Sequence, residues 1–308
     1  MAQFDVVFLG THNFAVKILQ GLISSPDFNV KLVITQPDQI VGRKKELQSP
    51  PVKILATQYN LPTAQPDNLK NFTIDLTKFD VAVVAQYGKI IPLQILKMPK
   101  FGMINVHASL LPKYRGASPI QLAILNGETT TGVTIMQMDE KMDTGPILAQ
   151  KEVIIGDNDT YTTLETKLAE TATPLLLASL KEYLQQTLKP QPQNDSQATY
   201  TKILTREDGK IDFNKTAQQI YNQWRAFLPW PGVFLETELH AQKIKIKLLK
   251  VQLTDLSSDS PTGSLTKIEK DRLGLVCGDK KILEVLELQL ENKNAIEAKA
   301  FINGYKIV

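Results

Sequence analysis

The chain contains very little cysteine and no long apolar segment. Its 308 residues include one cysteine, Cys277, which excludes an intramolecular disulfide framework and any metal cluster held by cysteines. Because Cys277 ends the apolar run LGLVC, we expect it to be a small buried residue of a strand. The N-terminus lacks the basic start and the long apolar stretch of a signal peptide, and no run of about 18 apolar residues could span a membrane. We therefore expect a cytoplasmic protein.

Motifs of several large protein classes are also missing. The first predicted strand ends in a single glycine, Gly10, and no G-x-G-x-x-G follows it, which argues against a dinucleotide at that turn. The sequence has no Walker motif, no zinc-ligand spacing and no G-x-S-x-G, so it does not indicate a P-loop, a zinc site or a serine hydrolase. The net charge of +3 is too small to indicate nucleic-acid binding by itself.

The length and the order of elements predict two domains. The chain is long enough for two domains of roughly 100–200 residues each. In residues 1–188 strand-like and helix-like segments alternate, which predicts an α/β fold with a doubly wound, mainly parallel, Rossmann-like sheet. Thr11 or Asn13 is expected to cap the first helix. We expect strands at residues 5–10, 30–35, 80–85, 103–107, 132–138 and 147–155, and further helices at 119–125 and 161–185.

The second part of the chain has a different pattern. Residues 189–206 are polar and contain Pro190 and Pro192, so we expect a linker there. Residues 207–308 combine one helix within 211–227 with short β-like runs between turns, a pattern that suits a small β-barrel or sandwich. Its strands are expected at 235–239, 244–249, 263–268, 274–276 and 281–290, and Gly304 is expected to cap a last helix.

The densest group of polar residues lies around Asn105 and His107. The two residues are two apart on a predicted strand, so their side chains share one face. They stand at the carboxyl end of that strand, where open α/β sheets build their sites. An amide beside an imidazole can donate two hydrogen bonds to an oxygen that gains negative charge during acyl transfer. The alternative is a strand-end histidine with a structural hydrogen bond.

Three acids follow the next predicted strand. Asp139, Glu140 and Asp143 lie in a loop at the strand's end, and a carboxylate near an imidazole would hold the ring and favour its charged form. Asp143 precedes Thr-Gly, and an aspartate in such a turn is commonly structural. The sequence pattern does not choose among the three.

A further loop, residues 86–92, places Gly88 on the same rim, where a ligand could approach the backbone.

Two basic features could contact phosphates. Arg43, Lys44 and Lys45 lie in a long loop after the second predicted strand. Lys243, Lys245 and Lys247 alternate with apolar residues, which sends the lysines to one face of a strand. Either feature could equally be an ordinary solvated surface.

The residues around Asn105 resemble a known family. The pattern Asn105-x-His107-x-Ser109-Leu-Leu-Pro112, followed by a loop that reaches Asp143-Thr-Gly145, is similar to the signature of the 10-formyltetrahydrofolate-dependent formyltransferases. The resemblance implies that Asn105, His107 and Asp143 are the catalytic trio. It also implies two folate-binding segments, comprising Ser109, Leu110, Leu111 and Pro112 in the first and Gln86, Tyr87, Gly88, Lys89 and Ile90 in the second.

The rest of the chain resembles the members of this family that formylate methionyl-tRNA. The similar segments include residues 8–15, 35–38, 42–43, 49–50 and 225–231. The resemblance implies an enzyme that takes 10-formyltetrahydrofolate as formyl donor and initiator methionyl-tRNA as acceptor, with no metal. It implies that the second domain is a barrel of the oligonucleotide-binding type along the tRNA, with Arg43, Lys44, Lys45, Lys243, Lys245 and Lys247 as candidate tRNA contacts. We expect a monomer. His12, Ile40 and Val41 depart from the family pattern, as does Lys44.

Three rival functions share parts of this pattern. A formyltransferase acting on an amino sugar nucleotide would share the first domain but would not require residues 225–231 or the basic loop at Arg43. A non-catalytic tRNA-binding protein would have no need of Asn105, His107 and Asp143 together. A hydrolase of formyl-folate would leave the basic loop and the second domain without a role.

Overall fold

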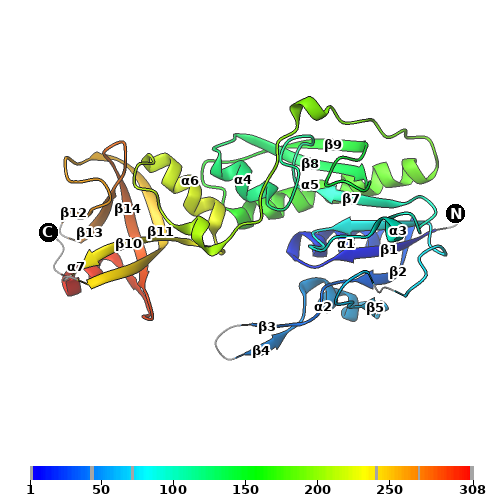
Figure 1. Cartoon of the computed structure of the whole chain (residues 1–308), viewed down its shortest axis with the longest axis horizontal. Coiled ribbons are helices and arrows are strands. Elements are labelled where there is room, and N and C mark those ends of the chain that lie inside the picture. The colour runs from blue at the N-terminus through cyan, green and yellow to red at the C-terminus, as the bar shows by residue number, and fades with distance from the viewer. Residues whose placement is uncertain (1–2, 42–44, 71–72, 240–241, 270, 306–308) are drawn as a thin grey trace. The chain divides into compact units, whose positions relative to one another are not determined.

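The computed structural model describes residues 3–41, 45–70, 73–239, 242–269 and 271–305. The chain divides into two compact units (Figure 1). Unit 1 consists of Met1–Pro119, Thr130–Ile154 and Leu164–Lys202, and unit 2 of Ile120–Thr129, Ile155–Thr163 and Ile203–Val308. Within the described ranges, no helix combines the length and apolar character needed to cross a membrane.

A seven-stranded sheet forms the centre of unit 1. Five neighbouring strands are parallel, and the last two strands are antiparallel, which confirms the doubly wound, mainly parallel sheet. Every residue of the central strand VAVVA is buried, as expected for a parallel strand covered on both faces. In sheet order the strands are β5 (Thr63–Ala64), β2 (Phe28–Ile34), β1 (Phe4–Gly10), β6 (Val81–Ala85), β7 (Met103–His107), β8 (Thr130–Gln137) and β9 (Ile147–Ile154).

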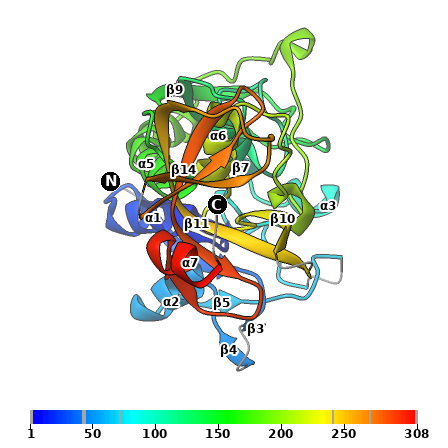
Figure 2. The same cartoon turned by 90° about the vertical axis from the view of Figure 1, so that its left-hand side faces the viewer.

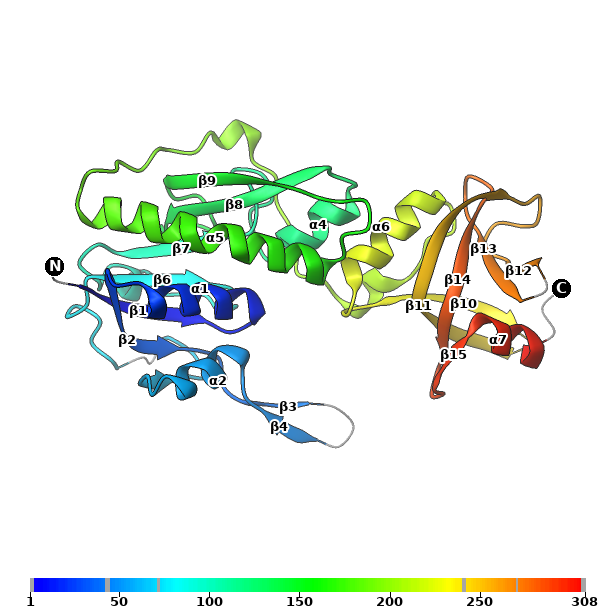
Figure 3. The same cartoon turned by 180° about the vertical axis from the view of Figure 1, so that it is seen from behind.

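The helices of unit 1 are α1 (Asn13–Ser24), α2 (Pro51–Gln58), α3 (Leu93–Leu96) and most of α5 (Tyr161–Leu184). Helices α1 and α5 lie over one face of the sheet (Figure 3). Helix α1 packs closely against α5, where Gly21 faces Thr173. Helix α3 adds Ile95 and Leu96 to a core cluster that includes buried residues of β1, β2 and β6.

The cap predicted for α1 is wrong. The N-cap is His12, whose side chain makes no capping hydrogen bond. Thr11 instead donates its hydroxyl to the backbone oxygen of Tyr87 at 3.0 Å. Thr11 does not cap α1 because its buried hydroxyl needs a hydrogen-bond partner, and the backbone just after the neighbouring strand β6 supplies one.

A short hairpin follows β2 and was not predicted from the sequence. It consists of β3 (Gln39–Val41) and β4 (Glu46–Gln48). Ile40 and Leu47 are 68% and 69% exposed, and the other hairpin residues whose burial is described, Gln39, Glu46 and Gln48, are exposed as well. These residues therefore do not produce the alternating pattern of a half-buried strand. Arg43 and Lys44 lie outside the described residues, whereas Lys45 is exposed in the turn with a φ of 54°.

Unit 2 contains an antiparallel sheet (Figure 2), which agrees with the β-barrel or sandwich expected for the second domain. Its strands are β10 (Val233–Leu239), β11 (Gln242–Ser257), β12 (Leu265–Glu269), β13 (Arg272–Val276), β14 (Lys281–Leu290) and β15 (Ala295–Glu297). The sheet order is β10-β11-β14-β13-β12, and β15 also pairs with β14. Helix α6 packs on β11 and β14, and α7 packs on β13, β14 and β15.

The helices of unit 2 differ in part from the prediction. They are α4 (Pro119–Leu125, assigned to unit 2 from Ile120), η2 (Arg206–Gly209), α6 (Ala217–Phe227) and α7 (Ala298–Tyr305). Helix α6 begins only after Thr216, which caps it by accepting a hydrogen bond from the N–H of Gln219. Gly304 lies inside α7 and is not its cap, because the helix continues to Tyr305.

Most of the polar segment expected to be a linker is part of unit 1. Residues 189–202 belong to that unit and include the short helix η1 (Asp195–Gln197). Ile147 of β9 exchanges two backbone hydrogen bonds with Gln191. Arg115 donates its N–H to the oxygen of Thr199, at 2.8 Å. We call residues 189–202 the strap, because they run along the loops that follow β7 and β8.

Candidate active site

Strand β7 places Asn105 and His107 on one face at its carboxyl end. The strand lies between β6 and β8, where Asn105 is opposite Val84 and Met136, and His107 is opposite Thr134. His107 is 6% exposed and Asn105 is partly buried. The pair therefore stands at the edge of the parallel strands where open α/β sheets form ligand sites.

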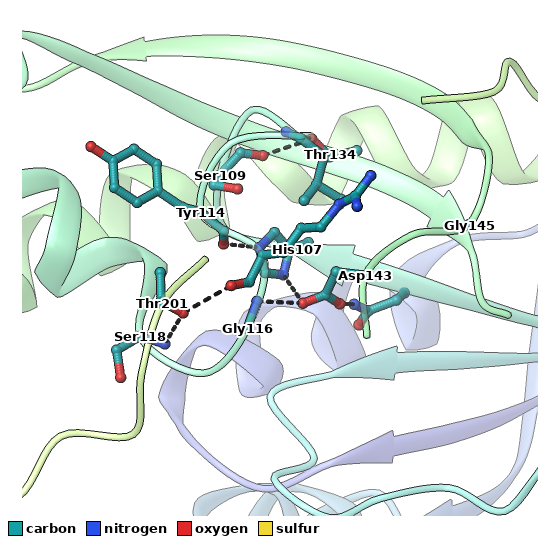
Figure 4. Close-up of polar contacts among 12 residues, drawn as sticks. His107, Ser109, Tyr114, Gly116, Ser118, Thr134, Asp143, Gly145 and Thr201 are labelled. Atoms are coloured by element: carbon teal, nitrogen blue, oxygen red, sulfur yellow. Dashed lines mark hydrogen bonds and ion pairs between the residues drawn. The ribbon is translucent and has the colours of Figure 1, made fainter. Parts of the chain in front are cut away.

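Asp143 is the acid that reaches this pair, and Figure 4 shows its contact with His107. Its Oδ1 lies 3.4 Å from Asn105 Nδ2, and its Oδ2 lies 3.7 Å from His107 Nδ1. The backbone N–H of Gly116 donates to Oδ2 at 2.8 Å. The side chain of Asp143 is only 13% exposed, so these contacts lie in a region of low dielectric constant, where they are stronger than in water.

The other two acids of the loop have different surroundings. The carboxylate of Asp139 accepts the hydroxyl of Thr144, at 2.7 and 2.8 Å, and the N–H of Lys141, at 3.1 Å. These bonds stabilise the turn of the loop. Glu140 is exposed. Of the three acids that the sequence pattern left open, Asp143 is the one that the structure brings to the imidazole.

The backbone of the loop holds Asp143 in a strained conformation. Its φ is 54°, which costs a non-glycine residue about 1–3 kcal/mol. The loop is closed at its base by Gln137, whose N–H donates to the oxygen of Pro146 at 2.9 Å. A Cβ on Gly145 would lie 1.9 Å from the backbone oxygen of Gln137, so this position accepts only glycine without movement of the loop.

His107 has its two ring nitrogens in different environments. Nε2 lies 3.0 Å from the backbone oxygen of Tyr114, which can only accept, so we assign a proton to Nε2. Nδ1 is the nitrogen that faces Asp143. The turn at Tyr114 to Gly116 thus holds both the ring and, through the N–H of Gly116, the carboxylate. This turn was not predicted from the sequence, although a glycine such as Gly116, whose φ is 114°, is a common signal of a turn.

The loop expected to bind folate lies next to the trio in the sheet. Gln86, at the end of β6, donates its side-chain amide to Glu165 at 3.2 Å, and Lys89 donates to the backbone oxygens of Pro66 and Asp67. Burial raises the pKa of Tyr87 to about 12.

The tip of this loop is more open. Ile90 is 88% exposed, and Gly88 has a φ of 75° and lies against Gln36. Gly88 and Ile90 are therefore the residues of the segment most accessible to a ligand.

The second expected folate segment forms a buried turn. Ser109 is fully buried and donates its hydroxyl to the backbone oxygen of Lys113 at 2.6 Å. Thr134 of β8 donates to the oxygen of Ser109 and accepts from the N–H of Leu111. Leu110 and Pro112 are partly buried. The side chain of Ser109 therefore shapes the turn, and only Leu110 and Pro112 have accessible surface beside it.

A cavity of about 1010 Å³ opens beside residues 138–146, the loop between β8 and β9 that we call the acidic loop. It is lined in part by Leu93, Phe101, Met138 and Tyr183. Neither the trio nor the two expected folate segments line it. Ionisable side chains such as Asp139 and Glu140 do line the cavity. We nevertheless place the site by the convergence of Asn105, His107 and Asp143, because these three side chains lie within contact distance of one another.

The lysines of β11 alternate as predicted. Lys243, Lys245 and Lys247 share a face, whereas Ile246 and Leu248 are fully buried. Across the strand pair, Lys243 is opposite Glu238 and Lys245 is opposite Glu236. The carboxylates opposite two of these lysines reduce the positive charge that the face offers to a phosphate backbone.

Comparison with known proteins assigns the chain to a family. The family model described as formyl transferase matches residues 4–180, and the model of the formyl transferase C-terminal domain matches residues 203–306. The chain belongs to the formyl transferase family. Residues 105–145, which supply the trio, lie inside the first match.

Curated members of the formyl transferase family are similar over nearly the whole chain. The chain is 44% identical over 308 residues to the methionyl-tRNA formyltransferase of Caldicellulosiruptor saccharolyticus, covering 98% of this chain and 97% of the relative. It is 40% identical to the methionyl-tRNA formyltransferase of Enterococcus faecalis, covering 97% and 95%.

Solved structures support the fold. A sugar 3N-formyl transferase, WlaRD, superimposes with a TM-score of 0.65 at 21% identity, covering 96% of this chain and all of that one. HypX from Aquifex aeolicus, solved with tetrahydrofolic acid, has a TM-score of 0.63 at 14% identity, covering 99% of this chain and 48% of HypX. At these identities the likeness concerns the fold alone.

Proposed function

We propose that the chain transfers the formyl group of 10-formyltetrahydrofolate to the α-amino group of initiator methionyl-tRNA and so supports translation initiation. The observation that carries the proposal is the convergence of Asn105, His107 and Asp143 at the end of β7. Full-length similarity to curated enzymes named for methionyl-tRNA supports the choice of acceptor.

The trio supplies the groups that formyl transfer needs. The amine nitrogen attacks the formyl carbon, and the formyl oxygen gains negative charge. Asn105 Nδ2 and His107 Nδ1 are the donors we assign to that oxygen, because Nε2 of His107 is already used by Tyr114. Removing one such donor typically lowers the rate roughly 10²–10³-fold.

Asp143 has two roles in this reaction, one toward the ring of His107 and one toward the proton of the attacking amine. Its carboxylate faces Nδ1 of His107 and orients the ring. It accepts, directly or through a water molecule, the proton that the amine loses. The bond between the formyl carbon and N10 then breaks, N10 takes up the proton that Asp143 accepted from the amine, and tetrahydrofolate leaves.

The remaining expected contacts belong to the same proposal. We assign the folate to the segments that begin at Gln86 and Ser109, with the exposed Ile90 and the partly buried Leu110 and Pro112 as its apolar contacts. In this proposal residues 1–188 form the catalytic domain and residues 207–308 form the tRNA-binding domain. Residues 189–206 join the two domains.

The tRNA contacts rest on charge and exposure. Lys45 is exposed in its hairpin turn, and Lys243 is exposed on β11, while Lys245 and Lys247 are partly buried. We propose Lys45 and Lys243 as the principal contacts of the described lysines, together with Arg43 and Lys44. We place the enzyme in the cytoplasm as a monomer.

Transfer of labelled formyl to different acceptors tests the proposal. Purified protein and formyl-folate are combined with methionyl initiator tRNA, with uncharged tRNA, with an amino sugar nucleotide, or with no acceptor. We expect label on methionyl-tRNA alone. Label on the amino sugar nucleotide indicates the first rival, release of formate without acceptor indicates a hydrolase, and tRNA binding without any transfer indicates a binding protein.

A further inference from the structure

The strap follows the two loops that carry the site. Its backbone is bonded to Ile147 at one end and to Arg115 at the other, where the N–H of Thr201 donates to the oxygen of Arg115 at 2.7 Å. Thr199 also accepts the N–H of Tyr114 through its hydroxyl, at 2.8 Å. The strap is therefore attached both to β9 and to the turn that holds His107.

Gln193, in the middle of the strap, reaches the acidic loop. Its side-chain amide nitrogen donates to the backbone oxygens of Asp143 and Gly145, at 2.9 and 2.8 Å. Its amide oxygen accepts from Arg115, from Nε at 3.2 Å and from Nη2 at 2.8 Å. The orientation of the amide follows from chemistry, because carbonyl oxygens only accept and a guanidinium only donates.

Arg115 fixes the other end of this link. Its side chain is 1% exposed, and Nη2 lies 2.6 Å from Oδ1 of Asp195 on the strap. The next residue, Gly116, donates its backbone N–H to the carboxylate of Asp143. One amide group, that of Gln193, thus connects the turn that holds the carboxylate to the loop that bears it.

The hydrogen bonds of Gln193 help to hold the backbone of Asp143 in its strained conformation. A residue with a positive φ keeps that conformation only where surrounding contacts over-determine it. Gln193 holds the carbonyl oxygens on both sides of Thr144, so it holds the segment that orients the carboxylate toward His107.

We propose that Gln193 is a positioning residue for formyl transfer, which acts by holding Asp143 against His107. The proposal rests on the function proposed above. It gives the strap a role in catalysis beyond that of a connection between the two parts of the chain, and it assigns the effect to the two N–H donations of Gln193.

The variant Gln193→Glu separates the hydrogen bonds that Gln193 accepts from Arg115 from those that it donates to the acidic loop. A glutamate has nearly the same shape and keeps the acceptor for Arg115, but it loses both donors and places a carboxylate oxygen beside two carbonyl oxygens. We expect kcat to fall about 10–100-fold, because displacing a catalytic group by about 1 Å has an effect of this size. The KM values for both substrates should stay within about twofold, because the lost interaction acts on the reaction step.

A matched control uses the same strap. Gln197 is exposed in η1, so Gln197→Glu adds the same charge without touching the acidic loop. We expect its kcat and KM to equal those of the wild type. Melting temperatures of both variants establish that the protein compared is folded.

A double-mutant cycle decides between positioning and general damage. In an Asp143→Ala background, Gln193→Glu should change the residual single-turnover rate by less than about twofold, because the group it positions is absent. The proposal is overturned if Gln193→Glu has wild-type kcat, if it raises KM at constant kcat, or if its effect is unchanged without Asp143. A wild-type protein that is inactive toward methionyl-tRNA contradicts the proposed function, whereas an active wild type with an equally active Gln193→Glu contradicts only the role of Gln193.

Discussion

Gly145→Ala is the most direct steric perturbation of the acidic loop. The added Cβ would lie 1.9 Å from the backbone oxygen of Gln137, whereas real Cβ atoms essentially never approach within 3.0 Å. The clash is with backbone, so no side-chain rotation relieves it. The loop must therefore move by about 1 Å, and a displacement of that size at a catalytic group lowers rates about 100-fold.

The expected result is a large loss of rate with a moderate loss of stability. Overpacking of this kind costs about 1–3 kcal/mol of unfolding free energy, which leaves most of the protein folded at low temperature. The assay is the single-turnover rate of formyl transfer at saturating concentrations of both substrates, measured together with thermal unfolding.

Gly21→Ala is the matched control for this experiment. Its Cβ would lie 2.2 Å from Cγ2 of Thr173, between helices α1 and α5 of the same unit and away from the acidic loop. It should lower the melting temperature and leave the turnover of the folded protein unchanged. A Gly145→Ala protein with normal turnover, or a Gly21→Ala protein with the same loss, would refute the argument from the loop.

Three further predictions concern other parts of the chain. Removing the exposed Lys45 (Lys45→Ala) should lower by about 1 the slope of log affinity for tRNA against log salt, in a binding titration at several salt concentrations, and an unchanged slope contradicts a phosphate contact. Burial raises the pKa of Cys277 to about 11, so near neutral pH the thiol should resist alkylation until the protein unfolds, and rapid labelling of the native protein contradicts this. The Arg272 guanidinium hydrogen-bonded to Glu284 holds the pKa of that carboxyl below its usual 4.5, so the pair stabilises the fold above that pH and the contribution is lost as the pH falls through the lowered pKa. Arg272→Met should remove this part of the acid dependence of the unfolding free energy, and an unchanged pH profile excludes the pair as its source.

Periodicity predicted the elements that bury an apolar face. The strands at β6, β7 and β14 and the helix at α4 were placed to within one residue, because each has a continuous or regularly spaced apolar pattern. The hairpin of β3 and β4 was missed because Ile40 and Leu47, the apolar hairpin residues whose burial is described, are exposed.

The candidate site was predictable only in part, because its contacts join distant segments. Strand spacing predicted that Asn105 and His107 share a face, since that relation is local. The choice of Asp143 depended on family resemblance, because a loop's conformation is set by bonds such as that from Gly116, which no local pattern encodes. Gln193 was missed for the same reason: its polar surroundings in the sequence indicate a linker, and its partners lie 48 to 78 residues away.

The single-turnover rate of formyl transfer to methionyl initiator tRNA by Asn105→Ala and Asp143→Ala tests the central claim most directly. Both variants should fold, bind both substrates and transfer formyl at least about 100-fold more slowly than the wild type, as expected when a group that stabilises the transition state is removed. Near-normal transfer by both folded variants would contradict the assignment of the site.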